Sequence, residues 1–191
     1  TGEPGSGKSI LLQYIGSVLV TAHLNNNPEI VRESLGLSSS DIPLPIFVPL
    51  NAYAKHLHDY SSSSDPTITT LPKFISHYLI HRHGALSLPS DFLERLFTEG
   101  KTVLLLFDGL DEVPSEDERI IISSSINDFA QAIPQARVVV SARANSYKGN
   151  AMLPSDFREM RIRPLNNSMV TQMVDRFYQA VYSKDDDERH R

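Results

Sequence analysis

Residues 2–9 read Gly2-Glu3-Pro4-Gly5-Ser6-Gly7-Lys8-Ser9, and this stretch decides the fold that we expect. It matches the pattern G-x-x-x-x-G-K-[ST] at every fixed position. Glycines let the backbone curl so that successive N–H groups converge on a polyphosphate, in φ/ψ regions that side chains would forbid. Lys8 supplies a full charge to the β- and γ-phosphates, and the Ser9 hydroxyl can ligate Mg²⁺. The pattern predicts a nucleotide-phosphate site, whose binding residues are Gly2, Glu3, Pro4, Gly5, Ser6, Gly7, Lys8, Ser9 and Ile10.

A helix is expected directly after this loop, from Ser9 to His23. Its apolar residues recur at three- and four-residue spacing, which predicts one buried stripe. The stripe consists of Leu11, Tyr14, Ile15, Val18, Leu19 and Ala22. The N-terminus of the helix would aim its partial positive charge at the same phosphates. A chance glycine-rich turn is the alternative interpretation, but such a turn need not open an amphipathic helix.

The clearest strand runs from Thr102 to Phe107, because six apolar or β-branched residues follow one another there. It ends in Asp108-Gly109-Leu110-Asp111-Glu112. A buried strand that ends in Asp predicts a second Mg²⁺ contact at Asp108, usually through water. Asp111 or Glu112 could orient or deprotonate the attacking water. The structural alternative is an acidic turn that leads into a helix.

The remaining patterns alternate between strands and helices. Strands are expected at residues 46–50, 137–142 and, more weakly, 159–162. Helices are expected at residues 28–35, 71–83, 90–99 and 167–182, and after the Ser115 to Glu118 capping box. The serine-rich stretch 61–66 indicates a surface loop, and the charged residues 184–191 indicate a frayed tail. The alternation predicts an α/β fold around a mostly parallel sheet, with helices on both faces.

Composition excludes several other classes of protein. At 191 residues, with 40% apolar and 21% charged residues, the chain is long enough for one globular domain. Its net charge of −5 offers no basic surface for direct nucleic-acid binding. The sequence contains no cysteine, which removes disulfides, thiolate zinc sites and cysteine nucleophiles, and agrees with a cytoplasmic location. No apolar run is long enough to predict a membrane span.

Two further clusters of side chains are candidates for sites. His77 and His81 are four residues apart on an expected helix, but Tyr78 stands where a zinc protease has Glu, so a solvated helix face is expected. Arg158, Arg161 and Arg163 alternate along the weak strand. They are interpreted as a solvated strand face, with a partner surface as the alternative.

The motifs together resemble the NACHT family, within the STAND class of P-loop NTPases. The resemblance is carried by the glycine-rich loop, by residues 105–114 (Leu-Leu-Phe-Asp-Gly-Leu-Asp-Glu-Val-Pro) and by the strand Val138-Val139-Val140 that leads into Arg143. The family's sensor arginine contacts the γ-phosphate, and Arg143 falls on that position. The family commonly reads Thr-Ser-Arg-Pro there, whereas this chain reads Ser141-Ala142-Arg143-Ala144.

The resemblance also implies an architecture. The sheet would have the order 5-1-4-3-2, with the first strand missing from this chain. Residues 1–165 would form the nucleotide-binding core, truncated at its N-terminus, and residues 166–191 the start of the following helical region. Flanking effector and sensor modules would belong to a larger chain.

The function implied is that of a regulatory switch. It would bind ATP, or GTP, with Mg²⁺, hydrolyse it slowly, and change shape and self-associate in a signalling or innate-defence protein. Asp111, Glu112 and Arg143 would be catalytic, and Ser9 and Asp108 would hold the metal. The alternatives are a P-loop ATPase with faster turnover and a nucleotide-binding scaffold without hydrolysis. A transport-ATPase signature of the L-S-G-G-Q type and a GTPase N-K-x-D motif are both missing from the sequence.

Overall fold

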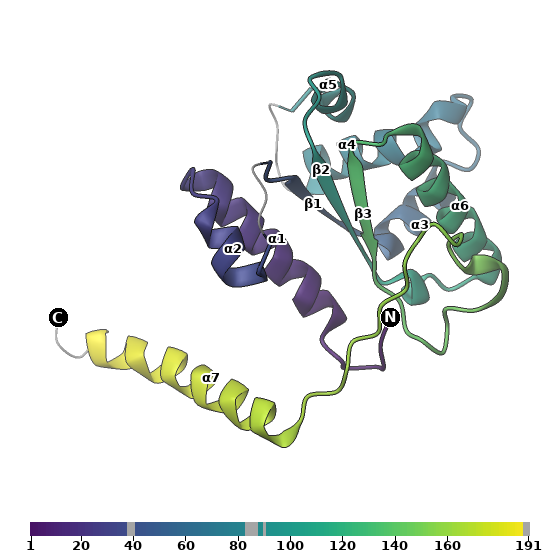
Figure 1. The fold of residues 1–191 in the computed structure, drawn as a ribbon. Helices are drawn as coiled ribbons and strands as arrows, with labels where there is room; N and C mark the ends of the chain where they lie inside the picture. The colour runs from purple at the N-terminus through teal and green to yellow at the C-terminus, as the bar shows by residue number, and fades with distance from the viewer. Residues whose placement is uncertain (38–40, 83–87, 90, 189–191) are drawn as a thin grey trace. The chain divides into compact units, whose positions relative to one another are not determined.

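Three parallel strands form a sheet in the computed structural model, which describes residues 1–37, 41–82, 88–89 and 91–188. The strands are β1 (Leu44–Pro49), β2 (Val103–Asp108) and β3 (Ala136–Val140), and they lie in the order β1-β2-β3 (Figure 1). Phe47 pairs with Leu106, and Leu106 with Val139, so β2 is the central strand of the three. This order matches the 2-3-4 part of the expected sheet, and the parallel α/β architecture is confirmed.

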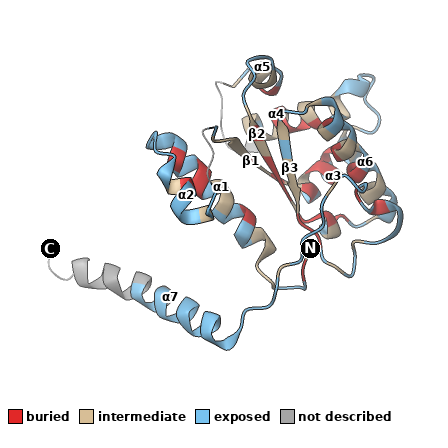
Figure 2. Cartoon of the chain, viewed as in Figure 1, coloured by how far each residue is buried: buried red, intermediate tan, exposed pale blue. Residues whose placement is uncertain are grey.

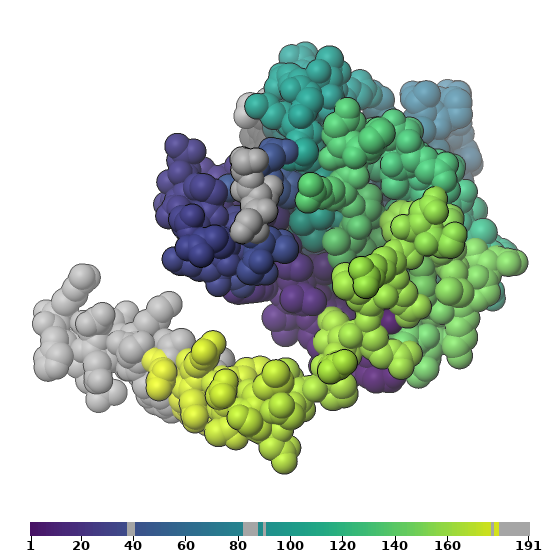
Figure 3. Space-filling model, in the orientation of Figure 1, coloured from purple at the N-terminus to yellow at the C-terminus, as the bar shows by residue number. Residues whose placement is uncertain are grey.

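Helices lie on both faces of this sheet. The helices of the described chain before residue 162 are α1 (Lys8–Leu24), α2 (Glu29–Leu35), α3 (Leu50–Asp59), α4 (Leu71–Arg82), α5 (Phe92–Thr98) and α6 (Glu116–Ala132). A further helix, α7 (Asn167–Glu188), follows them in the chain. Short 3₁₀ turns occur at Pro66–Thr69, Leu110–Glu112 and Gly149–Ala151. Figure 1 shows α1 and α2 on one side of the strands and α3, α4 and α6 on the other. In Figure 3, the purple and dark blue atoms of residues 1–37 are grouped in one part of the molecule.

The side chains of β2 alternate between the two faces of the sheet and contribute to the core on each face. Leu104 packs with the α1–α2 cluster, and the Leu106 side chain lies within 3.3 Å of the point where a Cβ on Gly16 would stand. Val103, Leu105 and Phe107 are fully buried in the larger core against α3, α4 and α6. A strand with both faces buried has no room for polar side chains, which explains its unbroken apolar sequence. Figure 2 colours the buried residues of β2 red.

The apolar stripe of α1 is buried only in part. Val18, Leu19 and Ala22 are buried as expected, and Leu12 is buried although the stripe did not include it. Leu11 and Tyr14 were expected inside, but they are 44% and 48% exposed. Both lie on the same helix face as Val18, Tyr14 one turn and Leu11 two turns closer to the N-terminus. The reason is the length of α2, which ends level with Tyr14, where the Tyr14 hydroxyl donates to Ser34 O (3.4 Å).

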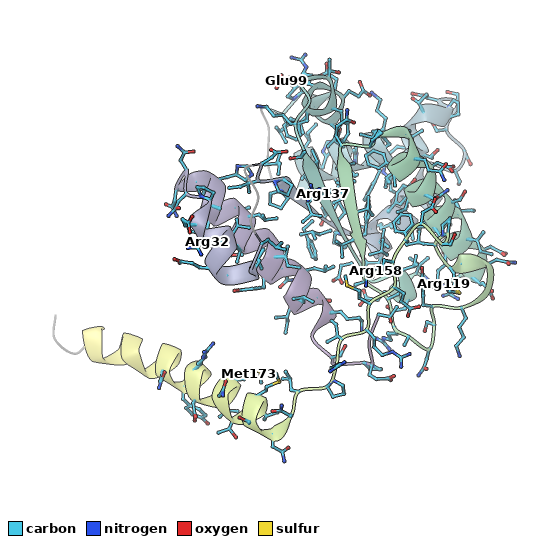
Figure 4. The ribbon with its side chains drawn as sticks, viewed as in Figure 1. Arg32, Glu99, Arg119, Arg137, Arg158 and Met173 are labelled. Atoms are coloured by element: carbon cyan, nitrogen blue, oxygen red, sulfur yellow. The ribbon has the colours of Figure 1, made fainter. Side chains whose placement is uncertain are left out.

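The expected strand at residues 159–162 is wrong, because these residues are irregular. The three arginines near it, among which Figure 4 labels Arg158, therefore share no strand face. The segment still lies beside the N-terminal residues: Thr1 N donates to Met160 O (2.5 Å), and Thr1 Oγ1 donates to Glu159 Oε1 (2.8 Å). These two contacts do not make a ladder, and a strand needs a hydrogen-bonded neighbour along its length.

Two helices differ from expectation. α3 was not expected, although Leu50, Tyr53, Ala54 and Leu57 have helical spacing and pack in the core. α7 was expected to end at residue 182 in a frayed tail, whereas the helix continues to Glu188. No glycine or proline interrupts residues 167–188, so nothing in the backbone ends the helix earlier. The tail residues 189–191 lie outside the described part of the chain, as do His83 and Ser90.

The compact units of the chain are residues Thr1–Arg161 and Ile162–Arg191. The second consists mainly of α7, and its described side chains are exposed apart from Ile162, for example Met173 at 56% (Figures 2 and 4). Among the described helices, none is both long enough and apolar enough to cross a membrane. The assignment of residues 1–165 to a core and of residues 166–191 to a following region stays a prediction.

A cavity of about 480 Å³ lies between α3 and α4. It is lined by Ala52, Lys55, His56, Asp59, Tyr60, Phe74, His77, Tyr78 and His81. His77 was expected on a solvated face, but it is half-buried, with its ring centroid 4.2 Å from that of His81 and 5.2 Å from that of His56. Burial lowers the pKa of His77, and the charges of His81 and His56 lower it further.

The shifted pKa of His77 predicts acid sensitivity of the fold. Because the folded pKa lies below the ordinary value of 6.5, the stability that His77 contributes is complete above that value and is lost as the pH falls below it. Thermal melts between pH 7.5 and 5.5 should therefore show a smaller drop in Tm for His77→Gln than for the wild type. His58→Gln, an exposed histidine on α3, is the control. An equal drop in all three proteins would contradict the expectation.

Candidate nucleotide-binding site

The glycine-rich loop has the backbone that its sequence requires. Gly5 and Gly7 have φ values of +73° and +84°, where a side chain would strain the chain. Gly7 precedes α1, and its carbonyl accepts from Leu11 N (2.8 Å), the first bond of the helical ladder. The N–H groups of the first turn therefore have no partner within the helix and are available to an anion.

Lys8 is held over the loop by the loop's own backbone. Its Nζ donates to Gly2 O (3.1 Å) and to Glu3 O (3.0 Å). Gly2 and Glu3 thus contribute carbonyl groups that position the ammonium. The Ser6 hydroxyl oxygen is buried and lacks a hydrogen-bond partner among the described residues. A buried polar atom without a partner is costly, and a phosphate oxygen in the loop would satisfy it.

The loop begins beside the end of β3. Gly2 forms an isolated parallel bridge with Arg143: Gly2 N donates to Ala142 O (3.3 Å), and Ala144 N donates to Gly2 O (3.4 Å). Figure 1 shows the N-terminus at this end of the strands. The carboxyl ends of parallel strands are the edge where α/β proteins bind ligands.

Ser141 connects β3 to the acidic end of β2. Its Oγ donates to Asp108 Oδ1 (2.5 Å) and accepts from Gly109 N (2.8 Å), and its backbone N donates to Phe107 O (2.8 Å). Ser141 is 6% exposed, so these bonds are shielded from water. They fix one oxygen of the Asp108 carboxylate. Ser141 was not among the site residues predicted from the sequence, because the only signal at this position is a polar residue directly after the apolar run of β3.

The turn that begins at Gly109 places the Glu112 side chain at the site. Gly109 has a φ of +78°, and the 3₁₀ turn Leu110–Glu112 follows it. A Cβ on Gly109 would stand only 2.9 Å from Glu112 Cδ, so the glutamate side chain folds over this glycine. Behind the turn, Arg119 of α6 donates from Nη1 to Val113 O (2.7 Å), and Figure 4 labels this arginine. Glu112 stands four residues after Asp108 in sequence, and the two carboxylates line the same cavity.

The neighbouring carboxylate, Asp111, forms an ion pair with Arg143. Its Oδ2 lies 2.8 Å from Arg143 Nε, and its Oδ1 accepts from Arg143 N (2.9 Å). The Asp111 side chain is 5% exposed and that of Arg143 is 48% exposed. The ion pair thus has a buried anion and a cation that reaches the surface of the site.

One cavity of about 240 Å³ gathers these groups. It is lined by Pro4, Gly5, Ser6, Gly7, Lys8, Ser9, Ile10, Asp108, Gly109, Asp111, Glu112, Ser141 and Arg143. Every site residue expected from the sequence lines it, except Gly2 and Glu3. The larger cavity between α3 and α4 has no comparable glycine-rich loop or helix N-terminus, so the smaller one is the candidate nucleotide site.

Comparison with known proteins agrees with this geometry. The family model described as NACHT domain matches residues 1–180. Comparison with the curated proteins and with the solved structures found no significant match. The family match covers nearly the whole chain, and it includes the phosphate loop, the acidic end of β2 and the arginine after β3. The chain therefore belongs to the NACHT family of P-loop NTPases.

Proposed function

We propose that this nucleotide-binding NTPase domain is a regulatory switch that binds ATP with Mg²⁺ and hydrolyses it slowly. The observation that carries the proposal is the cavity that joins the phosphate loop, three carboxylates and an arginine. Each of these groups suits one part of a metal–triphosphate complex. Membership of the NACHT family supports a role in signalling or innate defence, with self-association and with flanking effector and sensor modules. A cytoplasmic location agrees with the missing cysteines.

The metal would be held by Ser9 and Asp108. Both line the cavity, and both offer the hard oxygen ligands that Mg²⁺ prefers. Within the described residues, no group of three or more His, Cys, Asp or Glu side chains could hold a metal ion by itself. That sparse set fits Mg²⁺, which keeps several waters and takes substrate phosphates as ligands. When bound, the metal would neutralise charge that develops between the β- and γ-phosphates.

The remaining residues of the cavity would bind the phosphates, activate water and recognise the γ-phosphate. Lys8, the Ser6 hydroxyl and the loop N–H groups would bind the phosphate oxygens. Glu112 is exposed and lines the cavity, so it can reach a water molecule that attacks the γ-phosphate. Arg143 would distinguish triphosphate from diphosphate, because a ligand shifts a conformational equilibrium only through differential affinity.

Slow turnover is supported by the position of the candidate base. Glu112 stands at the end of a short 3₁₀ turn and is exposed, whereas Asp108 ends a buried strand and is fixed by Ser141. Among the described residues, no side-chain hydrogen bond fixes the Glu112 carboxylate. Such a base is poorly preorganised, and preorganisation contributes much of a catalytic rate. The preference for ATP over GTP rests on the family resemblance and on the missing N-K-x-D motif.

Steady-state phosphate release separates this function from its two alternatives. We expect turnover below about 0.1 per second with ATP and Mg²⁺, in the range of intrinsically slow P-loop switches. Turnover of about ten per second, which is typical of metabolic enzymes, would overturn the switch assignment in favour of a fast ATPase. Binding without any phosphate release after prolonged incubation would favour the scaffold.

A further inference from the structure

The Asp111 carboxylate has both of its oxygens engaged by one residue. Oδ2 pairs with Arg143 Nε at 2.8 Å, and Oδ1 accepts from Arg143 N at 2.9 Å. One contact holds the side chain of Arg143 and the other holds its backbone. The Asp111 side chain is only 5% exposed and that of Arg143 is 48% exposed, so the anion of this contact is shielded from water while the cation reaches the surface.

Glu112 differs from its neighbour in each of these respects. It is exposed, and its carboxylate folds over Gly109 at the wall of the cavity. A group that takes a proton from water must be able to reach that water. The exposed Glu112 carboxylate at the wall of the cavity meets this condition. Asp111 meets it less well, because its side chain is 5% exposed, its Oδ1 accepts from Arg143 N and its Oδ2 forms an ion pair with Arg143 Nε.

Arg143 has a backbone that is fixed from two sides. Asp111 binds its N–H, and the bridge to Gly2 holds the adjoining peptide groups. The guanidinium has five N–H donors, and its Nε lies 2.8 Å from Asp111 Oδ2 in an ion pair. The terminal nitrogens carry four of these donors, which can bind phosphate oxygens, and the ion pair at Nε restricts the direction in which they point.

We propose that Asp111 is a positioning residue that sets the direction of the Arg143 guanidinium in the nucleotide cavity, and that it is not the group that activates water. The inference rests on the proposed nucleotide site and assigns separate roles to the two adjacent acids. Glu112 acts on the attacking water, and Asp111 acts through Arg143 on the recognition of the γ-phosphate. Loss of Asp111 therefore impairs the distinction between triphosphate and diphosphate even when nothing is hydrolysed.

The test measures binding of a non-hydrolysable ATP analogue and of ADP, with Mg²⁺, to the 191-residue chain. The proteins are the wild type, Asp111→Ala, Asp111→Asn, Arg143→Ala and the double variant Asp111→Ala/Arg143→Ala. We expect Arg143→Ala to lower the ratio of the two affinities about 10- to 100-fold, the range of a hydrogen bond to a charged group. Asp111→Ala should lower it about tenfold, and should add less than about twofold once Arg143 is absent.

Asp111→Asn is a second, more conservative variant, which keeps the test valid if Asp111→Ala does not fold. Its Oδ1 can still accept from Arg143 N, while its amide nitrogen cannot pair with Nε, so it should shift the ratio in the same direction as alanine. Asp128→Asn, at an exposed position of α6, is the matched control and should leave the ratio unchanged. If both Asp111 variants keep the wild-type ratio, the inference is overturned. If the wild type binds neither nucleotide, the proposed function itself fails.

Discussion

Lys8→Ala should lower the affinity of the chain for ATP at least about 100-fold, which is the largest effect on binding that we expect. Lys8 Nζ sits over the phosphate loop on the carbonyls of Gly2 and Glu3, which leaves its third N–H for a phosphate oxygen. A charge-assisted hydrogen bond contributes about 1.5–3 kcal/mol, and the loss of a full positive charge beside a triphosphate adds to it. Displacement of a fluorescent ATP analogue, or calorimetry, measures the affinity directly.

Two companion variants keep this result interpretable. Lys8→Met retains the aliphatic stem and should lose affinity as Lys8→Ala does, because the charge and not the packing binds the nucleotide. Lys101→Ala removes the same charge at an exposed position before β2, at the opposite end of the strand from the site, and should bind ATP like the wild type. Unchanged affinity in both Lys8 variants would refute the assignment of the phosphate loop.

The part of the site that could be predicted from sequence is the part that local backbone geometry determines. The phosphate loop needs positive φ at Gly5 and Gly7, and only glycine supplies this without strain, so the requirement is visible in the sequence. Asp108 ends the most apolar strand of the chain, and the carboxyl ends of parallel strands meet at one edge of the sheet. These requirements place Lys8 and Asp108 in one cavity before any coordinates are known.

Other parts depend on residues far apart in the chain. The bond from Ser141 to Asp108 spans 33 residues, and no spacing rule connects the two. The separate directions of Asp111 and Glu112 depend on Gly109 and on the position of Arg143, which local propensity does not describe. The exposure of Leu11 depends on where α2 ends, and the irregular backbone at residues 159–162 depends on the lack of a paired neighbour. In each case tertiary contacts override a correct local pattern.

Glu112→Gln should slow ATP hydrolysis about 100- to 10,000-fold, the usual contribution of a general base, and should leave ATP affinity within about twofold. Glutamine has the size of glutamate and can still bind a water molecule, but it cannot accept the proton. Single-turnover phosphate release and equilibrium binding, measured on the same preparation, give the two quantities. Hydrolysis at the wild-type rate in this variant would remove Glu112 from the mechanism.

Gly109→Ala tests the same assignment through the backbone. The new Cβ would stand 2.9 Å from Glu112 Cδ, and at a φ of +78° it would also strain the chain by about 1–3 kcal/mol. The flexible glutamate side chain is the group that can move, so hydrolysis should slow because Glu112 leaves the cavity. Gly100→Ala has a similar φ of +70° with no atom within 4 Å of its Cβ, so it reproduces the strain without the collision and should keep the wild-type rate. Because Gly109→Ala acts by displacing Glu112, it should slow hydrolysis little further when it is combined with Glu112→Gln. If the double variant instead shows the rate losses of both single variants, Gly109 acts on Asp108 and the metal.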